Sequence, residues 1–232
     1  MQKDKKGNTA MATAKSKGQE DVANVLEEAW DLSIRAETRR MTAVKPSLPG
    51  AKPRKEALPK VNKKPKAKND LRLYSAAVEG VADRVAELLD QGVAIDQGDD
   101  FNNTPLIAAA SQGHLQVVTL LIRGGANLGS KGRGGIDALM RAIFMGHRGV
   151  VEELIQAGAP VDGRDEWGCT PLHAASYRGE VQMIQQLLDA GAEVESQDDE
   201  GQTPLHKAAA RGHVDAVKKL VENNASKLLV SL

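Results

Sequence analysis

An eight-residue stretch returns along this chain at a fixed interval. Gly168-Cys169-Thr170-Pro171-Leu172-His173-Ala174-Ala175 comes back, 33 positions later, as Gly201-Gln202-Thr203-Pro204-Leu205-His206-Lys207-Ala208. Counted backwards from Thr170, the same interval reaches Asp137-Ala138-Leu139, then Thr104-Pro105-Leu106, then Leu71-Arg72-Leu73. Self-similarity at such a period predicts a solenoid, in which each unit is too small to bury its own core and stacks on its neighbours.

Two further kinds of residue keep this spacing. Glycines recur at Gly80, Gly113, Gly146, Gly179 and Gly212, and an apolar pair recurs five times, as in Leu187-Leu188. Threonine is a good helix N-cap and proline fits the first helical position, while glycine suits the left-handed residue that ends a helix. Each unit is therefore expected to hold two short helices, the second burying its apolar pair.

The pattern resembles the ankyrin repeat, a 33-residue unit with the signature Thr-Pro-Leu-His-x-Ala. The resemblance covers residues 67–232 and implies an all-α solenoid of five helix–turn–helix repeats with β-hairpin loops. The expected repeats are 67–99, 100–132, 133–165, 166–198 and 199–232. The family binds proteins on a concave face, so the resemblance implies a non-catalytic interaction scaffold or adaptor.

Carrying the family's register onto this chain selects a set of residues for partner binding. Four of the six aromatic residues fall in this set, and aromatic residues and arginine are enriched at the centres of interfaces. The alternative is that these rings fill gaps between neighbouring hairpins. The set is Phe101, Arg133, Arg141, Phe144, Met145, Trp167, Tyr177, Arg178, Lys207 and Arg211. Its cations predict an acidic and apolar partner segment.

No residue pattern predicts catalysis or a cofactor. The five histidines fall in positions where the repeat favours histidine, and none has ligand spacing with a second histidine or with the single cysteine, Cys169. No serine or cysteine carries a nucleophile motif. We therefore expect no enzyme activity, no cofactor and no metal.

The first 70 residues carry the opposite charge to the rest. They hold 17 Lys+Arg against 9 Asp+Glu, a net of +8, and the remaining residues have a net of −8. Residues 1–18 are poor in large apolar side chains, which predicts disorder. An amphipathic helix is expected over 19–44, then a basic linker rich in proline and lysine over 45–66.

The expected helix carries an apolar stripe of Val22, Val25, Leu26 and Trp30. It is expected to fold back onto the repeats as an N-terminal cap, to dock on another chain, or to form only transiently. In the linker, Lys63, Lys64 and Lys66 resemble a basic nuclear-import signal. A nucleic-acid contact and a plain solvated spacer stay open for the linker.

Two other functions compete with the scaffold. One is a nuclear regulator whose basic arm contacts nucleic acid, and the other is a tethered subunit of a larger enzyme or assembly. The chain lacks an apolar run of membrane-spanning length and a signal-peptide pattern at its start. A monomer or complex subunit in the cytoplasm is expected, with the nucleus as the alternative.

Overall fold

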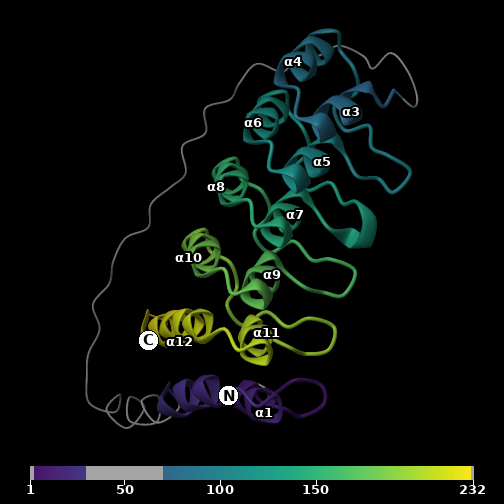
Figure 1. Cartoon of the computed structure of the whole chain (residues 1–232). Coiled ribbons are helices and arrows are strands. Elements are labelled where there is room, and N and C mark those ends of the chain that lie inside the picture. Colours follow the sequence, from purple (N-terminus) through teal and green to yellow (C-terminus); the bar gives the residue numbers. More distant parts are fainter. Residues whose placement is uncertain (1–2, 30–69, 231–232) are drawn as a thin grey trace.

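The computed structural model describes residues 3–29 and 70–230, with side chains as far as residue 223. Five helix pairs stack in one direction between residues 70 and 230 (Figure 1). The first helices form one layer: α3 (Arg72–Glu79), α5 (Pro105–Gln112), α7 (Ala138–Met145), α9 (Pro171–Arg178) and α11 (Pro204–Arg211). The second helices form the other: α4 (Ala82–Asp90), α6 (Leu115–Arg123), α8 (Arg148–Gln156), α10 (Val181–Asp189) and α12 (Val214–Val230). The predicted all-α solenoid is confirmed.

The first helices begin as their sequence predicts. Thr104 accepts a hydrogen bond from the backbone N–H of Ile107 at 3.3 Å, and Asp137 takes the same role for Met140 at 2.9 Å. Thr170 and Thr203 form capping boxes in which the histidine three residues later accepts from the threonine N–H. These caps fix where each first helix begins.

One residue of each apolar pair, rather than both, is fully buried. Leu187 has no exposed surface, whereas Leu188 is only partly buried against the core. Successive residues of a helix point about 100° apart, so both cannot face the same neighbour. Leu88, Leu121, Leu154 and Leu220 repeat this arrangement in the other second helices.

A loop that projects beyond the first helices precedes each of α5, α7, α9 and α11, and we call these loops fingers (Figure 1). In the finger before α5 the Asp99 carboxylate accepts from the backbone N–H groups of Phe101 and Asn103, both at 2.9 Å. The finger before α7 has Gly132 at that position and forms a 3-10 turn over Arg133–Gly135 instead. In the described ranges the bridge recorded is the isolated one between Lys3 and Thr9, so the fingers are tight turns rather than extended β-hairpins.

Residues 3–18 fold, and the expectation that 1–18 are disordered is wrong for them. Helix α1 (Ala10–Ser16) is capped by Thr9, residues 20–29 form a second helix, and the pair packs on the last repeat, beside α11 and α12 (Figure 1). Small side chains are enough here because the last repeat supplies the other half of the core. Ala14 has no exposed surface, and Val22 and Leu26 are each 1% exposed.

In this structure the apolar stripe of the N-terminal helix packs on the helix's own chain. Val22 and Leu26 are buried and Val25 is partly buried, all within this molecule. The helix caps the C-terminal end of the stack and not the N-terminal end where its place in the sequence would put it. Trp30, the rest of the expected helix to residue 44, the linker over 45–66 and its Lys63, Lys64 and Lys66 lie outside the described residues.

Candidate protein-binding surface

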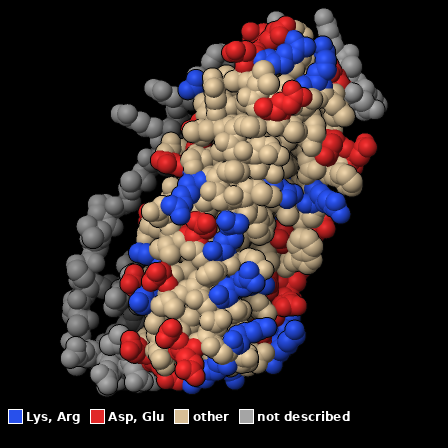
Figure 2. All heavy atoms as spheres, viewed as in Figure 1, with Lys and Arg blue, Asp and Glu red and all other residues tan. Residues whose placement is uncertain are grey.

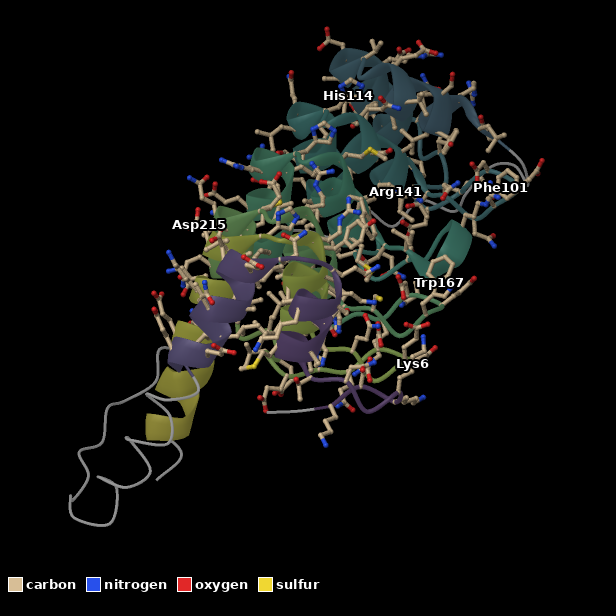
Figure 3. All side chains as sticks on the ribbon, turned by 60° about the horizontal axis from the view of Figure 1, so that its bottom comes forward. Lys6, Phe101, His114, Arg141, Trp167 and Asp215 are labelled. Atoms are coloured by element: carbon tan, nitrogen blue, oxygen red, sulfur yellow. The ribbon has the colours of Figure 1, made fainter. Side chains whose placement is uncertain are left out.

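Two aromatic side chains stand at the tips of fingers. Phe101 is 55% exposed and Trp167 is 59% exposed, the two most exposed large apolar side chains in the described residues. Figure 3 shows both on the edge where the fingers project, with Arg141 lying further in. His114 and Asp215 lie away from this edge (Figure 3). An exposed ring at a fixed place in separate repeats is the arrangement expected of anchors for a partner.

The Phe101 ring contacts the finger that follows its own, and the Trp167 ring contacts the finger that precedes its own. The guanidinium carbon of Arg133 lies 5.2 Å from the centroid of the Phe101 ring, within the range of a cation–π contact. Trp167 lies over Gly134, where a Cβ would come within 3.3 Å of the indole ring. Gly134 also has a φ of 77°, so the glycines of this finger both make its turn and leave room for the ring. The rings are held in place while one side stays open to solvent.

The C-terminal ends of the first helices continue this surface. Met145, the last residue of α7, is 47% exposed, and Tyr177 in α9 is 44% exposed. The guanidinium carbon of Arg211 lies 4.4 Å from the centroid of the Tyr177 ring. We call the surface made by Phe101, Arg133, Met145, Trp167, Tyr177 and Arg211 the finger face.

Three of the expected residues are more deeply engaged. Arg178 donates to the carbonyl of Phe144 at 2.6 Å and pairs with Glu180 at 3.5 Å, so it links two repeats while remaining exposed. Phe144 is partly buried against the core, and Arg141 is also half-buried. Phe144 lies in α7 and packs against the core, whereas the alternative expectation placed these rings in gaps between neighbouring hairpins.

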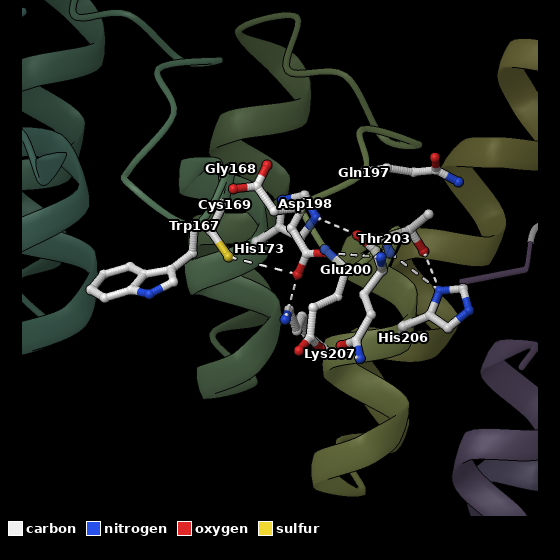
Figure 4. A network of polar contacts seen from close by, with 12 residues as sticks. Trp167, Gly168, Cys169, His173, Gln197, Asp198, Glu200, Thr203, His206 and Lys207 are labelled. Atoms are coloured by element: carbon white, nitrogen blue, oxygen red, sulfur yellow. Dashed lines mark hydrogen bonds and ion pairs between the residues drawn. The ribbon is translucent and has the colours of Figure 1, made fainter. Parts of the chain in front are cut away.

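Lys207 is not a free cation. Its ammonium lies 2.6 Å from the carboxylate of Asp198, whose side chain is 3% exposed (Figure 4). Burial opposes ionisation of Asp198, but hydrogen bonds from Lys207 and from the backbone N–H of Gln202 outweigh it and lower the pKa of the carboxyl. The pair stabilises the finger before α11, so Lys207 is structural.

The same network explains Cys169. Its thiol lies 3.9 Å from Asp198, and burial with two nearby carboxylates raises its pKa to about 11 (Figure 4). A thiol with such a pKa is almost entirely protonated at neutral pH and is a poor nucleophile. This agrees with a packing role at a finger position.

His173 and His206 each join their own repeat to the finger that follows it in the stack. His173 Nδ1 accepts from the Thr170 N–H at 3.1 Å, and its Nε2 lies 3.0 Å from the carbonyl of Gln202. A carbonyl only accepts, so Nε2 carries the proton and the ring is neutral. Burial accordingly lowers the pKa of His173. No group of three or more His, Cys, Asp or Glu in the described ranges is placed to hold a metal ion.

Positively and negatively charged side chains occupy different parts of the surface. Figure 2 shows Lys and Arg side chains along the middle of the face in view, with Asp and Glu side chains on the finger side, on the opposite side and at the top. The sequence analysis did not predict that the N-terminal unit, residues 3–29, adds side chains to this surface. Its finger adds Lys5 and Lys6, and Lys17 follows α1, all three exposed. The spacing Asp4-x-x-Gly7-x-Thr9, the same as Asp198-x-x-Gly201-x-Thr203, is the signal that could have revealed this unit.

The comparisons with known proteins agree with this architecture. The family described as "Ankyrin repeats (3 copies)" matches residues 73–165 and 139–230, which together make up most of the chain. The chain therefore belongs to the ankyrin-repeat family. Ankyrin repeats are protein-interaction modules and are typically non-catalytic.

One relative among characterised sequences shares part of the stack. A stretch of 66 residues, 28% of this chain, is 42% identical to the putative palmitoyltransferase ZDHHC13 of Danio rerio. The stretch makes up 10% of that protein, so this chain spans about a tenth of the relative's length. In the part of this chain that the structure describes, no helix is long and apolar enough to cross a membrane.

Proposed function

We propose that the finger face binds an extended segment of another protein that carries both acidic and apolar side chains. The observation that carries this proposal is the set of half-exposed apolar side chains Phe101, Met145, Trp167 and Tyr177 on successive repeats. The stack does not need these side chains in solvent, since its core consists of buried Leu, Ile, Val, Met and Ala. Aromatic side chains held rigidly are efficient anchors because little side-chain entropy is lost on binding.

The acidic character of the segment follows from the cations beside these anchors. Arg133 and Arg211 each lie over a ring, at 5.2 Å and 4.4 Å, and both are exposed. Their five-donor guanidinium groups match carboxylates well and are already oriented by the rings beneath them. A partner segment would place apolar side chains against the rings and carboxylates against the arginines.

The experiment is a selection from a displayed library of random peptides, with the full-length chain as bait. Selected peptides should combine Asp or Glu with large apolar residues. Trp167→Ala/Tyr177→Ala should weaken their binding by about 30-fold or more, since an anchor typically contributes about 2 kcal/mol. Charge reversal, Arg211→Glu, should slow association most strongly at low salt.

The matched control is Leu115→Ala. Leu115 is 44% exposed, as Tyr177 is, but belongs to the second-helix layer. Surface substitutions change stability by less than about 0.5 kcal/mol, so all variants should keep their melting temperature. Peptides that bind the double variant as tightly as the wild type, or that lack acidic residues, would refute the proposal.

The nucleic-acid and tethered-subunit functions rest on the basic arm, residues 1 to about 69. They stay predictions of the sequence. Salt-dependent binding to nucleic acid that is lost on deleting residues 45–68 would support the first of them. Co-purification at fixed stoichiometry with an enzyme would support the second.

A further inference from the structure

The N-terminal unit continues the stack with the contacts that join the repeats before it. Backbone hydrogen bonds link successive fingers, from Glu166 N–H to the Gly134 carbonyl and from Asp199 N–H to the Trp167 carbonyl, both at 3.0 Å. The next step of this series runs from Lys5 N–H to the Glu200 carbonyl at 2.8 Å. The series therefore passes from the C-terminal repeat to the N-terminal unit without a change of pattern.

The histidine clamp makes the same transition. His206 Nε2 lies 3.2 Å from the carbonyl of Asn8, as His173 Nε2 lies 3.0 Å from that of Gln202. Within its finger the Asp4 carboxylate accepts from the N–H groups of Lys6 at 2.9 Å and Asn8 at 2.7 Å. Asp198 does this for Glu200 and Gln202 at 2.9 and 2.8 Å.

The receiving surface is also shaped for this unit. Gly201 and Gly212, both with positive φ, have no side chain where the N-terminal unit approaches. A Cβ at Gly201 would come within 2.8 Å of the Lys5 nitrogen, and one at Gly212 within 2.3 Å of the Gln19 side chain. Ala10, Ala14 and Leu26, each at most 3% exposed, complete the apolar contact. Residues 3–29 thus extend the stack by a sixth helix pair, which comes from the N-terminal end of the chain but packs on the C-terminal repeat.

None of these contacts depends on which chain supplies the unit. We propose that the end of the last repeat, formed by α11, α12 and the finger at 198–202, is a docking site that a second copy of this chain can occupy with its own residues 3–29. About 40 residues separate the unit from the first repeat, and linkage within one chain gives the unit an effective concentration near the millimolar range at its own docking site. In dilute solution the N-terminal unit therefore docks on the last repeat of its own chain. Two chains exchange their N-terminal units when this docking within one chain is prevented.

Tether length decides between the two forms. Six stacked units with neighbouring helices about 8–10 Å apart place the first repeat roughly 40–50 Å from the N-terminal unit. About 40 residues can reach up to roughly 130 Å, but about seven can reach only roughly 25 Å. A chain with so short a tether cannot close on itself, although its N-terminal unit can still reach the docking site of a second copy.

The test is deletion of residues 34–66 in the full chain, with the molar mass measured by light scattering after size-exclusion chromatography. The wild type should elute as a monomer of 24.7 kDa at about 10 µM, whereas the deletion variant should have at least twice its own chain mass. Deletion of residues 50–66 is the control, because about 23 residues remain and can still span roughly 75 Å. That variant should stay monomeric.

Adding Ala14→Asp separates exchange from non-specific association. A carboxylate at this buried position should prevent docking of the unit on either chain, and the 34–66 deletion variant should then return to a monomer. Association that persists with Ala14→Asp would overturn the proposal, since an exposed apolar end would then be aggregating. A monomeric 34–66 deletion variant would overturn it equally, whether or not residues 3–29 are protected from hydrogen exchange.

Discussion

Truncation of Leu26 tests whether residues 3–29 are a docked unit of the stack. Leu26 is 1% exposed and belongs to the apolar stripe of the helix expected from residue 19. Replacing it with alanine removes three buried carbon atoms and leaves a cavity. If the unit were undocked, this side chain would be solvated and the change would cost almost nothing.

The size of the effect follows from the position of the unit. Leu→Ala changes in well-packed cores cost about 2.7–5.0 kcal/mol, the lower values belonging to sites that can partly collapse. The N-terminal unit has a neighbour on one side only, so it can relax, and we expect about 2–3 kcal/mol. In a solenoid each unit contacts only its neighbours, so the loss should stay within this unit and the last repeat.

Hydrogen exchange measured by mass spectrometry on the intact chain resolves this locally. A loss of about 2–3 kcal/mol should speed exchange of the amides in α1 and residues 20–29 by roughly 30- to 150-fold. Amides of α5 and α6 should keep their rates. Glu28→Ala, at an exposed position of the same helix, is the control and should change exchange by less than about threefold. Unchanged exchange over residues 3–29 in Leu26→Ala would refute the docked unit.

Two further predictions concern pH. Burial raises the pKa of Asp137 above 3.8, so ionisation costs stability in the folded state, and Asp137→Thr should gain on the wild type as pH rises from about 3.8 toward neutral. Urea melts at pH 3.5 and 7 that show equal differences would contradict this. Burial lowers the pKa of His173 below 6.5, so stability should fall as pH drops through about 6.5, by at most about 1.4 kcal/mol per pH unit. The pH dependence of urea melts between pH 7.5 and 5 should be weaker in His173→Gln, and an unchanged slope would rule out this histidine as its source.

Much of the stack could be predicted because the residues that begin and end each helix lie within the repeat itself. Thr170 and Pro171 specify a helix start by capping and by backbone geometry, and Gly179 specifies its end in the left-handed region, with a φ of 73°. These effects act over a few residues, so the sequence contains all that is needed. Which member of a pair such as Leu187 and Leu188 is buried depends instead on the rotation of the helix against its neighbour.

The roles of charged side chains were harder to predict. Lys207 and Arg141 occupy the same position, four residues after the N-cap of their first helix. Lys207, however, forms an ion pair at 2.6 Å with Asp198, which belongs to the preceding finger. The repeat register predicts that a side chain lies on the inner side of a first helix. It does not predict whether that side chain forms an ion pair with a carboxylate of the neighbouring finger. The same holds for Arg178, whose partners are a carbonyl and a carboxylate of different elements.

The N-terminal unit escaped prediction because it is out of phase with the other repeats. Thr9 and Leu71 are 62 positions apart, which is not a multiple of 33, and Ala10 and Ala12 replace the proline and histidine of the signature. A search by fixed interval therefore passes over it, while a search for the internal spacing of one unit would find it. Gly18 follows Thr9 as Gly179 follows Thr170, and Leu26 follows as Leu187 does.

The contacts that join the units explain why such an arrangement can exist. The last repeat contacts the N-terminal unit through a finger hydrogen bond, a histidine clamp and an apolar face, none of which requires the two to be consecutive in the chain. The order of units in space can then differ from their order in sequence, provided that the connecting segment is long enough. For this chain the consequence is electrostatic as well. The acidic finger at Asp199 and Glu200 is followed in space by the lysine finger of Lys5 and Lys6, so the N-terminal unit gives the stack a basic end that the repeats alone do not provide.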